Sequence, residues 1–208
     1  MKKFISISSL IIIAFFSSFN YAQEEDSVST SEWNFGVETD LYFTDPFIFL
    51  PIFIADKGNL HLEARYNYEA QRTVSTWVGY NFSVGKTVTL DVTPMFAGVF
   101  GDTNGMALGF EGTLTWRWLE LYSESEYVFS IGDWSKSFIY TWSTLTASPT
   151  DWLRLGLAVQ RTRAYETSLE IQRGFLVGVR TEHMGITAYM FNPDVHTPTY
   201  VFAFDLNW

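Results

Sequence analysis

From residue 33 onward, apolar and polar positions alternate along most of the chain. The stretch 60–69 reads LHLEARYNYE, in which apolar or aromatic residues occupy the even positions and polar residues the odd ones. A period of two places the two sets on opposite faces of a β-strand. The same pattern recurs in residues 33–44, 74–82, 88–96, 153–160 and 199–208. The chain is therefore predicted to be all-β, with one apolar and one polar face on each strand.

Residues 106–129 are too many for a single strand at about 3.3 Å per residue. Apolar residues occupy even positions as far as Trp118 and odd positions from Leu119 onward. This one-position shift predicts a tight turn that separates two strands. A β-bulge would also shift the phase, but it would leave the length unexplained.

The last stretch, residues 199–208 (TYVFAFDLNW), carries a row of bulky apolar side chains without charge and finishes on Trp208. It resembles the closing strand of Gram-negative outer-membrane β-barrels, whose terminal aromatic residue is recognised by the barrel assembly machinery. The resemblance implies a transmembrane, antiparallel, up-and-down β-barrel in the cell outer membrane, in contact with outer-membrane lipids. This strand would pair with residues 33–44 to close the wall, because an open edge in lipid leaves backbone groups unsatisfied.

Residues 47–56 (FIFLPIFIAD) are apolar on both faces and contain Pro51. They form either a strand beside a packed interior or a loop folded inward, and an edge, bulge or bend is expected near the proline. Barrels of this type have even strand numbers and both ends in the periplasm. We therefore predict about 12 strands, or 10 if two segments are loops. Connections at 101–105, 130–136, 164–167 and 192–198 would be extracellular, and those at 57–59, 85–86, 148–151 and 182–185 periplasmic.

The N-terminal residues 1–22 have the features of a secretory signal peptide. Lys2 and Lys3 precede an apolar run at 4–16, which is too short to span a membrane, and cleavage is expected before Gln23. Residues 23–32 are acidic and aperiodic, which predicts a flexible periplasmic lead-in, with a docking peptide as the alternative. Residues 33–208 would then form a single barrel domain.

Composition and charge exclude several classes of protein. Without residues 1–22 the chain has 11 basic residues (13 less the two lysines) against 23 acidic ones, which argues against binding nucleic acid. It contains no cysteine, so disulfides and thiolate chemistry are excluded. No later segment is apolar on all faces for about 20 residues, which argues against membrane helices. No cofactor and no metal site are expected, since the loop at 101–105 is too short for a calcium loop.

The polar strand faces would line the barrel interior. They carry the carboxylates Glu38, Asp40, Glu63, Glu69, Asp91, Glu111, Glu120, Glu124, Glu126, Glu170 and Asp205, together with His61 and the arginines Arg65, Arg117, Arg154 and Arg180. One hypothesis is a salt-bridge network that fills a narrow barrel. The other is a polar conduit whose excess negative charge favours cations or neutral solutes.

His61 is the one histidine on a predicted inward face. With Glu63 and Asp91 it could form an acid–base cluster, although a hydrogen-bonded structural histidine is the simpler interpretation. No serine lies two residues after His61, so a resemblance to barrel lipases or deacylases fails there. A site at His196 with Asp194 or Asp102 would be a second candidate. Both lack a credible nucleophile, and no catalytic residue is assigned.

Arg161, Arg163 and Arg173 fall on the predicted lipid face near the loop at 164–167. An arginine there costs about 2–4 kcal/mol at the bilayer midplane but little near the interface. The three are therefore expected to contact lipid phosphates in the outer leaflet, unless a bulge at Gly174 turns Arg173 away. The sequence as a whole predicts a narrow passive channel for small solutes or cations. A non-conducting structural or surface-interaction barrel is the alternative, and an outer-membrane hydrolase is the third hypothesis.

Overall fold

The computed structural model describes residues 32–132, 134, 137–162 and 171–208. In these residues thirteen β-strands form one antiparallel sheet. The strands are β1 (Asn34–Phe43), β2 (Ile48–Lys57), β3 (Leu60–Tyr66), β4 (Thr73–Tyr80), β5 (Phe82–Gly85), β6 (Val88–Gly101), β7 (Gly105–Trp116), β8 (Leu119–Ser130), β9 (Phe138–Ala147), β10 (Leu153–Thr162), β11 (Gln172–Arg180), β12 (Met184–Phe191) and β13 (Thr199–Asn207). No helix among the described residues is long and apolar enough to cross a membrane.

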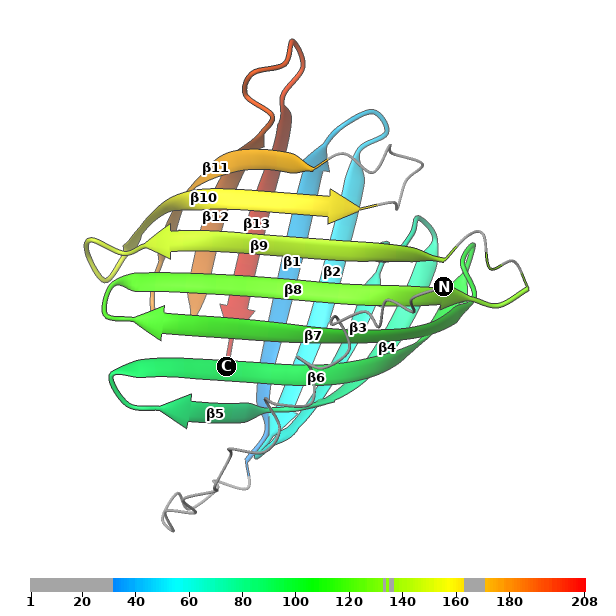
Figure 1. Ribbon diagram of the computed structural model, residues 1–208, viewed down its shortest axis with the longest axis horizontal. Coiled ribbons are helices and arrows are strands. Elements are labelled where there is room, and N and C mark those ends of the chain that lie inside the picture. The colour runs from blue at the N-terminus through cyan, green and yellow to red at the C-terminus, as the bar shows by residue number, and fades with distance from the viewer. Residues whose placement is uncertain (1–31, 133, 135–136, 163–170) are drawn as a thin grey trace, which may run out of the picture. The chain divides into compact units, whose positions relative to one another are not determined.

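The sheet closes on itself through β1 and β13, as predicted. Glu38 of β1 lies opposite Asp205 of β13, and the backbones of Phe35 and Trp208 exchange hydrogen bonds of 2.9 and 3.0 Å. Figure 1 shows the resulting barrel, with β6 to β10 forming the wall in front of β1, β2 and β13. This pairing leaves no open edge on β1 or β13, where unpaired backbone donors would face the lipid. The short strand β5 pairs only with β6 among the described residues.

Strands β4 and β5 together form one strand of the barrel, because both pair with β6. The ladder is interrupted beside Pro94 of β6, whose nitrogen carries no hydrogen to donate. At the gap the Asn81 amide donates to the Asn59 carbonyl at 2.8 Å, and the Thr93 hydroxyl donates to the Asn81 side chain at 2.7 Å. The barrel therefore has the 12 antiparallel strands that the sequence predicted.

The doubly apolar segment is strand β2, which confirms the first of the two alternatives for it. Pro51 pairs with Thr39 of β1, and the ladder between β2 and β3 begins only at Ile52, just beyond the proline. The Phe49 carbonyl accepts a hydrogen bond of 3.1 Å from the Asn67 side chain. Pro51 therefore lies outside the ladder between β2 and β3, so its missing N–H removes no hydrogen bond from that ladder.

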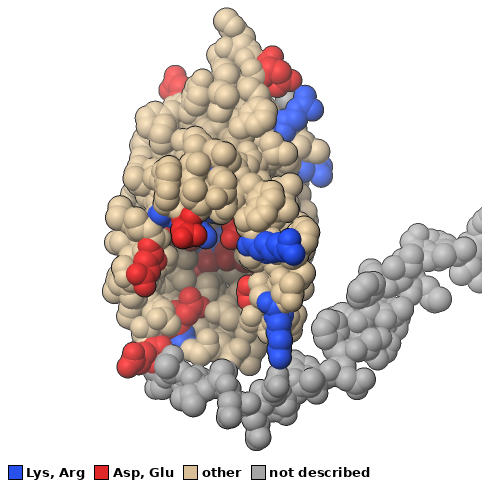
Figure 2. Space-filling view, turned by 90° about the vertical axis from the view of Figure 1, so that its left-hand side faces the viewer, with Lys and Arg blue, Asp and Glu red and all other residues tan. Residues whose placement is uncertain are grey.

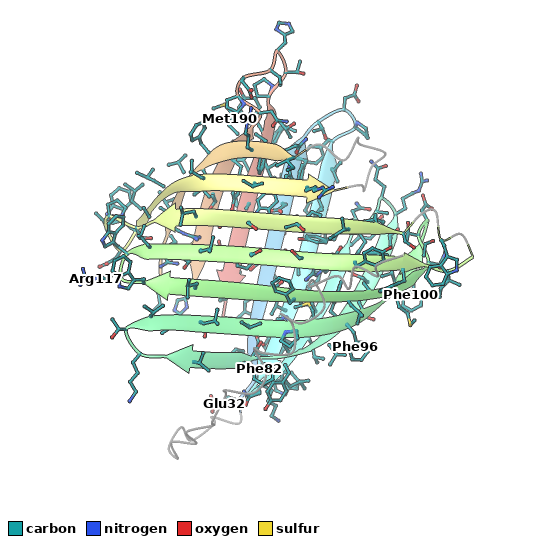
Figure 3. All side chains as sticks on the ribbon, in the orientation of Figure 1. Glu32, Phe82, Phe96, Phe100, Arg117 and Met190 are labelled. Atoms are coloured by element: carbon teal, nitrogen blue, oxygen red, sulfur yellow. The ribbon has the colours of Figure 1, made fainter. Side chains whose placement is uncertain are left out.

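The shift of phase at Trp118 is a two-residue hairpin turn between β7 and β8, as predicted. Arg117 begins the turn with a left-handed backbone (φ +57°), and its guanidinium lies 5.4 Å from the centre of the Trp116 ring. The prediction that Arg117 lines the interior is wrong, because β7 ends one residue before it. Figure 3 shows Arg117 at the extremity of the barrel.

The connections divide between two ends of the barrel. The end with the short connections β2–β3, β5–β6, β7–β8, β9–β10 and β11–β12, and with the paired ends of β1 and β13, is called the turn end. The opposite end, with the described connections β1–β2, β3–β4, β6–β7 and β12–β13, is called the loop end. The predicted periplasmic connections at 57–59, 85–86, 148–151 and 182–185 fall at the turn end, and the predicted extracellular ones at 101–105 and 192–198 fall at the loop end. The predicted connection at 164–167 and part of that at 130–136 lie outside the described residues. Which membrane side each end faces stays a prediction.

The outer surface of the barrel is apolar. Large side chains such as Phe53, Phe96 and Leu108 are more than half exposed, and Figure 3 labels Phe82, Phe96 and Phe100 on this surface. Trp134 is exposed between β8 and β9, and the other exposed tryptophans of the described residues lie at the turn end, namely Trp33, Trp116, Trp118, Trp152 and Trp208. An apolar band bordered by aromatic residues is the surface that a transmembrane barrel presents to lipid and headgroups.

Candidate functional site in the barrel interior

A cavity of about 310 Å³ occupies the interior toward the turn end. We call it the acidic vestibule, because six carboxylates and two arginines border it: Glu38, Asp40, Glu111, Glu120, Glu124, Asp205, Arg154 and Arg180. Figure 2 looks into the barrel from the left-hand side of Figure 1, where the hollow opens and carboxylates are visible within it. Glu38 and Asp205 come from the two strands that close the barrel. The vestibule therefore carries a formal excess of four negative charges.

A second cavity of about 270 Å³ lies toward the loop end and is called the loop-end cavity. Its lining comes from the β1–β2 connection and from the polar side chains Gln71, Gln160 and Gln172, together with Tyr42 and apolar residues of β2. Asp45 is the single charged residue among those that border it. The Tyr42 hydroxyl donates to Gln160 at 3.2 Å. This cavity is much less charged than the acidic vestibule.

Tyr68 and Tyr140 border both cavities and separate them. Their rings meet edge to face with centroids 5.2 Å apart, and both are more than nine-tenths buried. The Tyr68 hydroxyl donates to Glu124 at 2.7 Å, and the Arg65 guanidinium lies 4.6 Å from the centre of the Tyr68 ring. We call this pair the tyrosine septum. It is the narrow point between the two cavities.

Arg65 is the centre of the buried charge. The residue is 2 % exposed, and its guanidinium contacts four carboxylates, those of Glu63 (2.5 Å), Glu124 (2.7 Å), Glu111 (3.3 Å) and Glu126 (3.5 Å). The planar group also stacks against Tyr68 and Trp77, as arginine does on aromatic faces. One guanidinium thus holds together glutamates from three strands.

His61 lies between two carboxylates. Its Nδ1 is 2.8 Å from Asp56 and its Nε2 is 2.9 Å from Glu63. The sequence placed His61 beside Asp91 as well, but Asp91 is exposed farther along β6 toward the β5–β6 turn and no contact joins the two among the described residues. Neither ring nitrogen contacts a serine, so the described contacts provide no nucleophile for a hydrolase.

Glu69 is buried, but not on a strand as predicted. β3 ends at Tyr66, and the connection that follows folds into the barrel with Asn67 and Arg72 in left-handed conformations. The Glu69 carboxylate accepts hydrogen bonds from Ser75 and from the Trp77 indole. The prediction of a longer strand is wrong because the polar alternation continues beyond the end of β3. Glu69 lies in the barrel interior, in the connection between β3 and β4, and is not part of a strand.

An apolar cluster fills much of the interior beside the tyrosine septum. Ile48, Leu50 and Ile52 of β2 face inward and pack in one buried cluster with Tyr140, Trp142, Phe191 and neighbouring residues. The Trp142 ring meets Phe191 at 5.2 Å and Tyr189 at 5.1 Å between centroids. The apolar inward face of β2, which made this segment ambiguous in the sequence, is thus matched by aromatic residues of β9 and β12.

Most of the predicted lining residues fall into two groups. Glu38, Asp40, Glu111, Glu120, Glu124, Arg154, Arg180 and Asp205 border the acidic vestibule, while His61, Glu63, Arg65, Glu69 and Glu126 are buried in the interior. Glu120 pairs with Arg154 at 2.6 Å across the vestibule wall. Arg117 and Asp91 lie near the turn end outside these groups, and Glu170 lies outside the described residues.

The arginines predicted to contact lipid phosphate lie near the loop end. Arg161 is exposed in the outward row of β10, next to Val159. Arg173 is exposed at the start of β11 and pairs with Asp194 at 3.2 Å, and Arg163 lies outside the described residues. A backbone hydrogen bond at Asp194 and the bond from Arg173 lower the pKa of the Asp194 carboxyl. Contact of these arginines with lipid phosphate stays a prediction.

No protein-family model and no curated protein matches the chain. Among solved structures, it is similar to a KdgM porin, with 12% sequence identity and a TM-score of 0.58 over 82% of this chain and 98% of that one. It is also similar to a KdgM porin in complex with disordered oligogalacturonate, with 9% identity and a TM-score of 0.57 over 83% and 98% of the two chains. The chain therefore has the fold of a porin-like outer-membrane barrel.

Proposed function

We propose that this protein is an outer-membrane channel for small solutes, with a narrow pathway that favours cations and neutral molecules over anions. The pathway runs from the acidic vestibule past the tyrosine septum to the loop-end cavity. The observation that carries the proposal is that two cavities, one toward each end of the same barrel, share the residues Tyr68 and Tyr140. The porin fold of the chain supports the same class of function.

The selectivity follows from the charge of the vestibule. Six carboxylates against two arginines produce a negative potential, which concentrates cations and repels anions in a site with low-dielectric walls. One of the similar porins is in complex with oligogalacturonate, a chain of sugars that each carry a carboxylate. Such a polyanion would be repelled by this vestibule. We therefore infer that the solute of this protein is cationic or neutral.

A non-conducting structural barrel is the second candidate, and the tyrosine septum favours it. Tyr68 and Tyr140 are almost completely buried, and the apolar cluster around Trp142 fills much of the interior beside them. If these side chains exclude water between the two cavities, the barrel would act through its surface rather than its interior.

Reconstitution of the purified protein in planar bilayers separates the two candidates. A channel is expected to produce discrete conductance steps whose size grows with salt concentration, whereas detergent carried over without protein produces none. If the folded protein inserts and shows no steps at any salt concentration, the channel proposal fails and the structural barrel stands.

A further inference from the structure

We propose that the interior contains a binding site for one divalent transition-metal ion, with His61, Glu63 and Glu111 as its ligands. Among the described residues these three can each offer one ligand atom such that all the atoms lie within 4.8 Å of one another. Two ligands on one ion at about 2.0–2.2 Å lie at most about 4.4 Å apart. The three atoms would therefore have to move closer together on binding, and water would occupy the remaining coordination positions. The proposal does not depend on whether the barrel conducts.

Asp56 orients the imidazole in the way that metal-binding histidines require. Its carboxylate lies 2.8 Å from His61 Nδ1 and also accepts a hydrogen bond of 2.7 Å from the Asn81 side chain. Histidine ligands usually donate their second ring N–H to a carboxylate, which fixes the tautomer. With the hydrogen on Nδ1, His61 directs the lone pair of Nε2 at a Glu63 oxygen 2.9 Å away. Two acceptors that face each other need a cation or a proton between them.

The buried charge around the site is also out of balance. The guanidinium of Arg65 contacts Glu63, Glu111, Glu124 and Glu126, so four carboxylates share one guanidinium, and His61 contacts only Glu63 among them. One oxygen of Glu126 is buried without a hydrogen-bond partner. Buried carboxylates are costly unless they are paired, protonated or bound to a metal. A divalent ion bound between the His61 imidazole and the Glu63 carboxylate would offset two of these negative charges.

Arg65 is compatible with a metal at this position. It contacts Oε2 of Glu63 and Oε1 of Glu111, whereas Oε1 of Glu63 faces His61. The guanidinium would then hold both ligand carboxylates from the side away from the ion, as hydrogen-bond donors do around metal ligands. Glu111 is 25 % exposed and borders the acidic vestibule, which provides an electrostatically favourable route for a cation from the turn end.

The ligand set indicates the class of metal. One imidazole and two carboxylates suit Mn²⁺, Fe²⁺, Co²⁺ or Zn²⁺, whereas Ca²⁺ requires six to eight oxygen ligands and Mg²⁺ binds imidazole poorly. Zn²⁺ and Mn²⁺ are therefore the probes, and Mg²⁺ is the comparison ion.

The test is equilibrium dialysis of the folded, detergent-solubilised barrel against Zn²⁺ or Mn²⁺ with an excess of Mg²⁺. We expect about one bound Zn²⁺ per chain, at least a tenfold loss of affinity in His61→Gln and Glu111→Gln, and a loss of about 10–100-fold in Asp56→Asn. Glu120→Gln is the matched control, because Glu120 borders the same vestibule but pairs with Arg154. The shift in gel mobility on heating verifies that each variant is folded.

Two results would overturn the proposal. One is a folded wild type that retains no stoichiometric Zn²⁺ or Mn²⁺ in the presence of Mg²⁺. The other is a loss of binding in Glu120→Gln as large as in Glu111→Gln, which would indicate diffuse attraction to the vestibule. If the variants fail to fold, X-ray absorption spectroscopy of the Zn²⁺-loaded wild type identifies the ligand atoms around the ion and tests the proposal instead. One imidazole nitrogen with oxygen ligands supports the site, and an all-oxygen shell contradicts it.

Discussion

The substitution Arg65→Gln removes the single positive charge at the centre of the buried glutamates. Its four carboxylate partners lie on β3, β7 and β8, so the guanidinium connects strands on either side of β4 and β6. Glutamine retains hydrogen-bonding capacity but no charge. The carboxylates would be left facing one another in an interior where Glu63 and Glu126 are nearly inaccessible to water.

Removing one partner of a buried ion pair typically costs about 3–5 kcal/mol, because an uncompensated charge remains. Arg65 also stacks on Tyr68 and Trp77, and each such contact contributes about 0.5–2 kcal/mol. These terms overlap, since the same group makes all the contacts, so they do not add in full. We therefore expect Arg65→Gln to lower the free energy of unfolding by about 3–5 kcal/mol.

Urea unfolding of the barrel in lipid vesicles, followed by tryptophan fluorescence, measures this difference. Arg72→Gln is the matched control, because Arg72 pairs with Asp102 at the surface with its side chain 76 % exposed. The control should leave the unfolding midpoint unchanged. If Arg65→Gln shifts the midpoint no more than Arg72→Gln does, the central role assigned to Arg65 is refuted.

Two further substitutions and one deletion test the septum, the wall and the closure. Tyr68→Ala should raise single-channel conductance severalfold by opening the septum, whereas Tyr66→Ala, on the outer surface, should leave it unchanged. Gly156→Ala should lower the free energy of unfolding by about 1–3 kcal/mol, since its Cβ would lie 2.3 Å from a backbone oxygen of β9. Gly112→Ala, whose Cβ would meet nothing closer than 3.8 Å, should be nearly neutral in the same urea titration. Deletion of Trp208 removes both hydrogen bonds to β1 at the turn end and should reduce the yield of folded barrel in membranes, without altering the conductance of the barrels that assemble.

The strand architecture was predictable because a barrel wall imposes a strict period of two on its sequence. The phase shift at Leu119 located a two-residue turn, and the demand for an even strand number assigned residues 47–56 to the wall. The alternation does not predict where each strand of the wall ends. Arg117 continues the polar alternation of β7 but belongs to the turn, since alternation alone does not determine where hydrogen bonding to β8 ends.

The interior was predictable as a list of residues but not as an arrangement. Tyr68 follows the apolar row of β3 in the sequence and was expected on the outer surface, yet the connection after Tyr66 turns it into the interior. The grouping of Glu111 with His61 and Glu63 was not visible either. Glu111 is about fifty positions after the other two residues in the sequence, and its strand β7 is separated from β3 by β4 and β6. The curvature of the barrel wall brings the three side chains together.

The reversal potential of the reconstituted protein across a tenfold KCl gradient tests the central claim most directly. A pathway through the acidic vestibule predicts a potential of the sign for cation preference, below the limit of about 59 mV for perfect selectivity. Asp40→Asn with Asp205→Asn should move it toward zero, because both carboxylates border the vestibule. A potential of zero, or of the sign for anion preference, in the wild type would contradict the account.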